Sequence, residues 1–265
     1  MPSTASPDPG PSAAKRPLRG FLSMNPYPGP MTDGLFFRDK MRAIHRIAPE
    51  RIGPSLLEIG GGRSGLSKML YPDAAVTVVD RDPAFADAPC NRRPGVAFRA
   101  ADATALPFED ASFDAVTLFD LLEHVEDDDA VAREALRVVR PGGVVMVTTP
   151  DAARWRYPYF RALEPICPPE AELFERWGHV RRGYDPERLE AMFGGRPERA
   201  SSFINPWLAL SHDIAFSRLS RRARRALHAL AAPVSLWGWL RPAGPGRGTE
   251  IAAAWRRDGP GGARA

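Results

Sequence analysis

Three consecutive glycines and a later carboxylate are the residues of this sequence best suited to bind a ligand. Gly60, Gly62 and Gly65 fit the pattern G-x-G-x-x-G, in which glycine allows a tight turn and a close backbone approach to a ligand. Asp80 follows at the distance where such sites carry a carboxylate for ribose hydroxyls. The pattern predicts a site for a nucleoside-containing cofactor, a dinucleotide included. A glycine-rich turn without a ligand is the alternative, and Asp80 in register argues against it.

The residues around the glycines predict the local structure that such a site needs. Leu56, Leu57 and Ile59 form a short apolar run that stops at glycine, as a strand buried on both faces of a parallel sheet does. Residues 64–71 have helical spacing and end at Pro72. A second apolar run, 76–79, leads into Asp80. Together these segments predict one βαβ unit.

The rest of the chain continues this alternation of helices and short apolar strands. An amphipathic helix is expected to begin after Asp33, a good N-cap, and to end before Pro49. Further strands are predicted at 96–100, 115–119, 144–149, 199–204 and 248–255, helices at 129–139 and 186–193, and a helix or loop at 83–94. Alternating strands and helices predict a doubly wound α/β sheet.

The composition of the 265 residues suits one large domain in a reducing compartment. With 44% hydrophobic residues the chain is able to bury a substantial core. Cys90 and Cys167 provide neither a disulfide framework nor metal-ligand spacing, so a cytoplasmic protein is expected. The sequence has no secretory signal pattern and no apolar run of the ~18 residues that a spanning helix needs. Residues 1–20 and 256–265 are expected to be disordered tails of a domain over 21–255.

Five motifs in a fixed order carry a resemblance to a known family. They are LLEIGGGRSG, VVD, the run ADA-x-x-LPF-x-D-x-SFD, LEHV, and RPGG followed by VVMVTTP. In this order and spacing the chain resembles the class I S-adenosylmethionine-dependent methyltransferases, in particular the branch of ubiquinone- and menaquinone-type small-molecule enzymes. The resemblance covers about residues 34–150, with weaker similarity at 177–193 and 248–255. It implies a Rossmann-like, doubly wound, seven-stranded sheet whose last strand is antiparallel.

The resemblance also implies the cofactor, S-adenosyl-L-methionine, and the residues that bind it. Glu58 would support the glycine loop and the methionine ammonium, Asp80 would accept both ribose hydroxyls, and Asp102 would meet the adenine amino group. The full predicted set is Glu58, Gly60, Gly61, Gly62, Asp80, Arg81, Asp102, Ala103, Phe119 and Asp120. Ser64 departs from the family, where glycine is common, and a slightly altered turn is expected there.

Two histidines are candidates for catalysis. An acidic acceptor needs a base with a pKa near neutral, which histidine supplies. His124 follows the strand at 115–119, and His179 lies in a stretch that approaches the active site in similar enzymes. The alternatives are that His124 packs against the adjoining helix and that His179 is hydrogen-bonded within a loop, while the other three histidines are expected to be structural. No metal is expected, because the acidic residues 126–129 suit the first turn of a helix.

Two segments fall outside the alternating pattern. Residues 151–183 are rich in aromatic residues and would either wall an acceptor pocket or pack a small core of their own. Residues 205–247 combine an arginine cluster with an apolar, tryptophan-bearing stretch and form a helical insertion before the last strand. This insertion would either lie over the active site as a lid or contact an anionic membrane surface. The arginines lack the pattern of a nucleic-acid module, so no nucleic acid is expected as a partner.

Two functions follow from these patterns. The first is a methyltransferase that acts on a small-molecule or lipid-like acceptor. The second is a non-catalytic partner subunit that binds S-adenosylmethionine. The retained cofactor residues favour binding of the cofactor under both functions.

Overall fold

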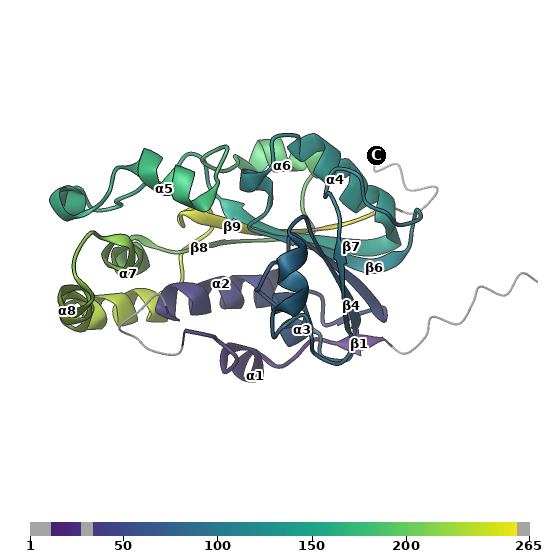
Figure 1. Cartoon of the computed structure of the whole chain (residues 1–265), viewed down its shortest axis with the longest axis horizontal. Helices are drawn as coiled ribbons and strands as arrows, with labels where there is room; N and C mark the ends of the chain where they lie inside the picture. The colour runs from purple at the N-terminus through teal and green to yellow at the C-terminus, as the bar shows by residue number, and fades with distance from the viewer. Residues whose placement is uncertain (1–11, 28–33, 259–265) are drawn as a thin grey trace, which may run out of the picture.

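The computed structural model describes residues 12–27 and 34–258, and its centre is a seven-stranded sheet (Figure 1). Across the sheet the strands follow the order β5-β4-β3-β6-β7-β9-β8. Within these residues β9 alone runs antiparallel to its neighbours. The predicted Rossmann-like, doubly wound sheet with an antiparallel last strand is confirmed. The strands are β3 (Ser55–Ile59), β4 (Ala75–Asp80), β5 (Val96–Ala100), β6 (Phe113–Phe119), β7 (Val139–Pro150), β8 (Arg199–Phe203) and β9 (Glu250–Arg256).

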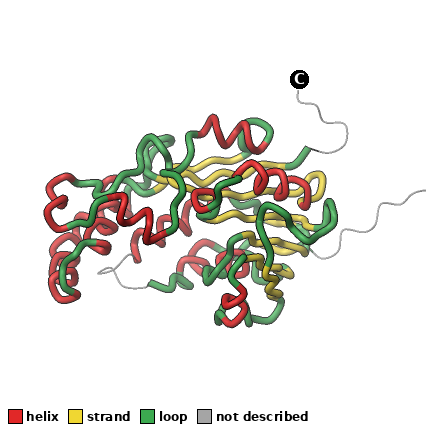
Figure 2. The backbone as a smooth tube through the Cα atoms, turned by 45° about the horizontal axis from the view of Figure 1, so that its top comes forward, coloured by secondary structure: helices red, strands yellow, loops and turns green. Residues whose placement is uncertain are grey.

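Helices cover both faces of this sheet (Figures 1 and 2). Successive side chains of β3 point to opposite faces, so that Leu56 joins one buried cluster while Leu57 and Ile59 join the other. One face is covered by α2 (Gly34–Ile47) and α3 (Leu66–Leu70). The other is covered by α4 (Asp128–Val138) and α6 (Pro186–Phe193). Both faces of the central strands are therefore buried, as their continuous apolar runs predict.

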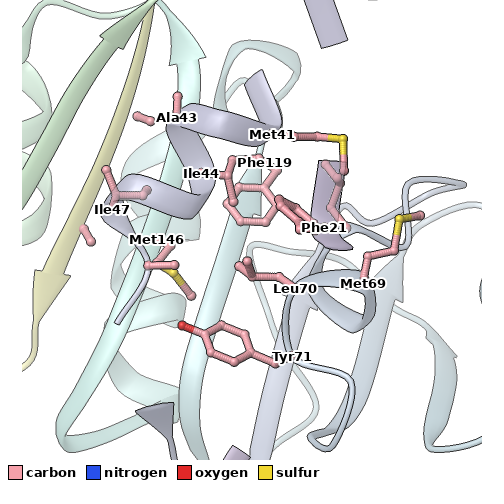
Figure 3. Close-up of a cluster of buried hydrophobic side chains, with 14 of the residues drawn as sticks. Phe21, Met41, Ala43, Ile44, Ile47, Met69, Leu70, Tyr71, Phe119 and Met146 are labelled. Carbon is pink, nitrogen blue, oxygen red and sulfur yellow. The ribbon is translucent and has the colours of Figure 1, made fainter. Parts of the chain in front are cut away.

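The core beneath α2 fixes this helix against the strands that carry the site (Figure 3). Met41 and Ile44 of α2 are fully buried beside Phe119 at the end of β6. Tyr71, also fully buried, donates a hydrogen bond from its hydroxyl to the Pro49 carbonyl oxygen over 2.7 Å. This packing holds α2 in one position over the sheet, so that polar residues of α2 face the strand ends reproducibly.

Residues 12–20 are folded, so the predicted disordered tail is wrong for this part of it. Ala13–Ala14 (β1) pairs with Arg51–Ile52 (β2), and a short helix, α1 (Leu18–Leu22), follows. The Lys15 ammonium donates to the His45 and Ala48 carbonyl oxygens at the C-terminal end of α2. A cation suits this position because the last carbonyls of a helix lack backbone partners. Composition does not reveal such a contact; residues 1–11 lie outside the described residues.

The predicted C-terminal tail likewise starts too early. Arg256 is the last residue of β9, and its guanidinium donates to the Gly142 carbonyl oxygen at 2.7 Å. The backbone amide of Arg257 donates to the Gly143 carbonyl oxygen at 2.9 Å. Residues 259–265 lie outside the described part of the chain, as do the predicted cap Asp33 and the adjoining loop residues 28–30.

The two additional segments form separate helical elements. Residues 151–183 contain η3 (Arg161–Ile166) and α5 (Glu170–Trp177), and Trp155, Tyr157 and Leu173 form a small core there. The 205–247 insertion contains α7 (Pro206–Phe216) and α8 (Arg221–Leu240), which are helical as predicted. In the chain from 12 to 258, apart from 28–33, neither α8 nor another helix has the length and apolar content for membrane crossing. Short 3-10 turns occur at η1 (Pro83–Asp87) and η2 (Leu122–His124).

Candidate active site

The glycine loop at the end of β3 forms the floor of the candidate site. Gly60 and Gly62 have φ angles of +69° and +47°, in the region that favours glycine. The Gly60 amide donates to the Val79 carbonyl oxygen at 2.8 Å, which ties the loop to β4. A Cβ atom on Gly60 would lie 2.5 Å from Leu121 Cδ1, so a side chain does not fit there. The hydrogen bond to β4 and the close packing of Leu121 therefore fix the backbone of the loop beside the strand ends.

Glu58 is a buried carboxylate that lacks a full set of partners. The residue is 1% exposed, and its Oε1 accepts a hydrogen bond from Ser64 Oγ at 2.5 Å. Its Oε2 is buried without a partner among the residues that the structure describes. Burial raises the pKa of this carboxyl group, and the hydrogen bond from Ser64, the polar groups of Ser67 and the charge of Lys40 oppose that rise. A cation with N–H donors, such as the ammonium of a methionine moiety, would satisfy the orphaned oxygen. Ser64, the departure from the family, supports Glu58.

Asp80 and Asp102 lie at the ends of the next two strands with their carboxylates oriented by backbone amides. Asp80 Oδ2 accepts from the Gly62 amide at 3.0 Å, which joins it directly to the glycine loop. Asp102 Oδ1 accepts from the amide and the hydroxyl of Thr104 at 2.8 and 2.7 Å. These hydrogen bonds lower the pKa of Asp102, and the charge of Arg81 lowers it further. Local hydrogen bonds therefore orient both carboxylates, and their contacts with ribose and adenine stay predictions.

Asp120 follows β6 with a positive φ angle and is held by Thr148 and Lys40. Its φ is +51°, its amide donates to the Thr148 carbonyl oxygen at 2.9 Å, and its Oδ1 accepts from Thr148 Oγ1 at 2.6 Å. Its Oδ2 forms an ion pair with the Lys40 ammonium from α2. Non-glycine residues held in this region cluster at active sites, and in this chain Ala111 and Ile204 adopt it as well. Phe119 is buried in the core cluster (Figure 3), and its contact with the cofactor stays a prediction.

The predicted cofactor residues share one edge of the sheet. Glu58, Asp80 and Asp120 are at or just after the carboxyl ends of β3, β4 and β6, and Asp102 follows β5. Gly61 lies in the loop, Arg81 is exposed beside Asp80, and Ala103 packs against the core next to Asp102. Ligands of open α/β sheets bind at this edge. The geometry agrees with the predicted assignment, and each residue's contact with the cofactor remains a proposal.

A pocket of about 400 Å³ opens beside Asp120, and aromatic side chains form its walls. Phe36 and Phe37 come from α2, Trp155 and Trp177 from the 151–183 segment, and Phe216 from α7. The aromatic segment therefore packs a small core and also lines this pocket, and its contact with an acceptor stays a prediction.

His124 and His179, predicted to be catalytic, meet in this pocket. Their ring centroids are 4.6 Å apart in an edge-to-face arrangement. His124 Nδ1 lies 3.2 Å from the Gly178 carbonyl oxygen, so that a proton on Nδ1 would leave Nε2 with a free lone pair. Burial, and the neighbouring His124, lower the pKa of His179 to about 4. His179 is thus a neutral imidazole near pH 7, and its Nδ1 is buried without a partner in the described chain.

Four polar residues of the pocket escaped prediction. Glu123 is 1% exposed and accepts from Thr149 Oγ1 at 3.1 Å; burial, and then the charge of Asp120, raise its pKa to about 8. Burial, with the same carboxylate, raises the pKa of Glu250 well above its ordinary value. Glu123 lies within the motif LEHV, which could have pointed to it. No sequence pattern pointed to Lys40 or Glu250 as residues of the pocket. His212, expected to be structural, lines the pocket with its ring stacked on Phe36 at 4.8 Å.

Three side chains that line this pocket form a set of potential metal ligands. The ligand atoms of Glu123, His124 and His179 lie within 4.8 Å of one another. One carboxylate and two imidazoles is a donor set that zinc accepts, with donors about 3.3 Å apart once metal is bound. The expected absence of a metal therefore stays a prediction. The acidic run at 126–129 has the structural role that was predicted, since Asp127 caps α4 by accepting from the Ala130 amide.

His212 makes protein stability depend on pH. Burial lowers the pKa of His212 from 6.5 to about 4, so below pH 6.5 the unfolded chain takes up a proton that the folded protein does not. This contribution to stability is complete above pH 6.5 and is lost as the pH falls towards 4. His212→Phe keeps a ring on Phe36 and removes the titration. When the pH falls from 7.5 to 5, we expect the free energy of unfolding of the variant to rise by about 1–2 kcal/mol relative to that of the parent. Urea unfolding of both proteins at both pH values measures this difference. The same change in the free energy of unfolding for variant and parent would contradict the prediction.

The fold and the site define a class of protein. A doubly wound sheet with an antiparallel last strand, a glycine loop after its first parallel strand and a carboxylate after each neighbouring strand suit a nucleoside cofactor at the switch of strand order. Comparison with known proteins identifies the family. Residues 57–147 match the family described as methyltransferase domain. This match supports a class I S-adenosylmethionine-dependent methyltransferase domain in this part of the chain.

Named relatives support this assignment over part of the chain. A demethylmenaquinone methyltransferase of Renibacterium salmoninarum is 39% identical over 51% of this chain and 57% of its own length. A phthiotriol/phenolphthiotriol dimycocerosates methyltransferase of Mycobacterium ulcerans is 38% identical over 42% of this chain and 44% of its own. The chain spans about half the length of the curated relatives it matches.

Solved structures extend the likeness in fold to nearly the whole chain. An S-adenosylmethionine-dependent methyltransferase of Thermotoga maritima has a TM-score of 0.56 and 16% identity, and the match covers 91% of this chain and 97% of that one. At this identity the likeness concerns the fold alone.

Proposed function

We propose that this protein transfers a methyl group from S-adenosyl-L-methionine to a small-molecule or lipid-like acceptor bound in the pocket beside Asp120. One observation carries the proposal. Asp120 lies at the carboxyl end of the strands, beside the predicted cofactor residues, and also lines the aromatic pocket. When bound, the cofactor supplies an electrophilic methyl group, and transfer needs mainly an acceptor held in contact with it and shielded from water. Phe36, Trp155 and Trp177 exclude water from the acceptor, and the Lys40 ion pair fixes Asp120.

The nature of the acceptor follows from the pocket and is supported by the relatives. Aromatic walls around about 400 Å³ suit an apolar ring or the head of a lipid. The names of the two relatives above point to a menaquinone precursor and to a dimycocerosate lipid. His124 serves as the base for the acceptor proton, and His179 holds its ring in place. No residue of the pocket suggests nucleic acid as the acceptor, and the cytoplasmic location stays a prediction.

Methyl transfer to an acceptor separates this proposal from a non-catalytic partner subunit. The protein is incubated with cofactor labelled in its methyl group and with fractions of a cell extract. A labelled small molecule or lipid supports the enzyme, and identifying it names the acceptor. Cofactor binding without label transfer to any fraction would favour the partner subunit.

The cofactor site makes a quantitative prediction for two carboxylates. S-adenosylhomocysteine should bind, whereas NAD should not. Asp80→Ala should weaken the binding by about 1–3 kcal/mol, because charge-assisted hydrogen bonds to the ribose are lost. Asp102→Ala should cost less, since adenine keeps backbone contacts beside Ala103. Titration calorimetry of the three proteins measures both differences. Tight NAD binding, or a folded Asp80→Ala protein with parental affinity, would show that the site is assigned wrongly.

A further inference from the structure

The pair of helices α7 and α8 exposes an unusually apolar surface. Five large apolar side chains of α8 and one of α7 are well exposed, with Leu230 at 78% and Leu240 at 61%. Leu230, Val234 and Trp237 recur at helical spacing and form one continuous stripe. We call the following set the α7–α8 surface: Trp207, Leu230, Val234, Leu236, Trp237 and Leu240. Exposed apolar patches of this kind mark interaction sites.

Arginines flank this stripe and carry a net positive charge. Arg221, Arg222 and Arg225 in the first turns of α8 are exposed, and no ion pair engages them within the described residues. At the other end, the Arg241 guanidinium stacks over the Trp237 ring at 3.9 Å. Residues 217–241 contain neither aspartate nor glutamate. The surface is therefore cationic as well as apolar, and its natural complement is an apolar layer with a negatively charged boundary.

The surface and the acceptor pocket share a helix. Helix α7 contributes His212 and Phe216 to the pocket and Trp207 to the surface. Gly238 of α8 packs so closely on α7 that a Cβ there would lie 2.6 Å from Trp207 Cβ. Figures 1 and 2 place the helix pair at one end of the molecule. Contact through this end would bring the pocket close to whatever the surface binds.

Helix α2 holds the helix pair to the core. The Arg42 guanidinium donates to the Trp239 carbonyl oxygen at 2.8 Å and stacks over the Trp239 ring. Trp239 thus packs inward while Trp237 and Leu240 face outward. Because α8 is fixed to α2 through Trp239, its exposed face is held in one position, as a docking surface requires.

We propose that the α7–α8 surface docks in the plane of an anionic phospholipid bilayer. A basic helix with tryptophan and leucine on its exposed face partitions at the lipid headgroups, with apolar side chains below them and arginines among the phosphates. The same helix is too polar to cross the bilayer. A second copy of this chain is a poorer complement, because residues 217–241 of that copy offer no aspartate or glutamate to pair with the arginines. Docking does not require methyl transfer, and it lets the pocket receive a lipid-borne acceptor.

Sedimentation with vesicles tests this directly, without cofactor or acceptor. The full chain should bind phosphatidylcholine vesicles that contain about 30% phosphatidylglycerol at least about tenfold more tightly than phosphatidylcholine alone, and should be released as salt rises. Leu230→Glu with Trp237→Glu should reduce this binding at least about tenfold. Arg222→Glu with Arg225→Glu should remove the preference for the anionic lipid.

The control is a variant of equal charge change elsewhere, Arg133→Glu with Arg196→Glu, both exposed residues on other elements. It should bind anionic vesicles like the parent. Circular dichroism and light scattering confirm that each variant is folded and report its oligomeric state. Binding that is absent, or that the control loses equally, overturns the proposal. So does a dimer that Leu230→Glu and Trp237→Glu dissociate without affecting vesicle binding, since the surface would then join two copies.

Discussion

Replacing Glu58 with glutamine is expected to stabilise the cofactor-free protein and to weaken its affinity for S-adenosylmethionine by about 2–4 kcal/mol. The two effects have one cause. Glu58 Oε2 is buried without a partner among the residues described, and burial raises the pKa of the carboxyl group. An amide of the same shape removes a buried charge of which, in the described chain, only one oxygen, Oε1, accepts a hydrogen bond, from Ser64. The same amide no longer neutralises a bound ammonium. Thermal unfolding with and without cofactor, together with calorimetry, measures both effects.

Asp39 supplies a matched control, because it is equally buried but fully paired. It is 1% exposed, and its carboxylate accepts from the Ile204 amide at 2.9 Å and from the Arg42 guanidinium. Asp39→Asn should therefore destabilise the protein by about 1–3 kcal/mol and leave the affinity for S-adenosylmethionine unchanged. If Glu58→Gln instead destabilises the protein as Asp39→Asn does, Glu58 is a structural residue and does not receive the cofactor.

The parts of the site that sequence predicts are those built from neighbouring residues. The strand, glycine turn, helix and Asp80 lie within one βαβ unit, and hydrophobic periodicity with glycine placement determines such a unit locally. The predicted strand at 96–100 agrees with β5 in both bounds. The helix predicted at 64–71 is shorter in the structure, where Gly65 caps α3 in a left-handed conformation.

The parts that sequence does not predict depend on contacts between distant segments. Lys40 and Asp120 are 80 positions apart, and the packing of α2 on the sheet decides that they pair. Glu250 enters the pocket because β9 inserts between β7 and β8. His212 lies on a helix whose apolar character suggests only burial, and its place in the pocket depends on the position of α7. No local pattern carries this information. The glycines and Asp80 follow from the local pattern, whereas Glu58, Asp102, Phe119 and Asp120 were predicted from the family resemblance.

The helical insertion illustrates the same limit. Between two strands that a short hairpin could join, 205–247 suggests a separable addition. In the structure the Asp213 carboxylate accepts from the amides of Tyr159 and Phe160 at 2.9 Å each, which fastens α7 to the 151–183 segment. Because Phe216 also lines the pocket, the insertion reaches the pocket and also carries the exposed α7–α8 surface. The two predicted roles are therefore compatible.

Replacing His124 with asparagine is expected to lower kcat by about 10²–10⁴-fold, with little change in KM, for the acceptor that the labelling experiment identifies. Asparagine is able to keep a hydrogen bond to the Gly178 carbonyl oxygen, as His124 Nδ1 does at 3.2 Å, but it has no basic nitrogen. The pocket should therefore still bind the acceptor, but it should lack a base that accepts the proton of the acceptor. Initial rates over a range of acceptor concentrations separate the two parameters.

Two further measurements distinguish a base from a packing residue. Added imidazole should restore part of the activity of His124→Asn, because it enters the space that the ring leaves and accepts the proton. His45→Gln, on α2 and hydrogen-bonded to the Arg16 carbonyl oxygen, serves as the control and should keep the parental kcat. An unchanged kcat for His124→Asn would mean that the acceptor transfers no proton to this residue. A reduced kcat that imidazole does not restore would mean that the ring only shapes the pocket, because the lost group would then act through contact and not through proton transfer.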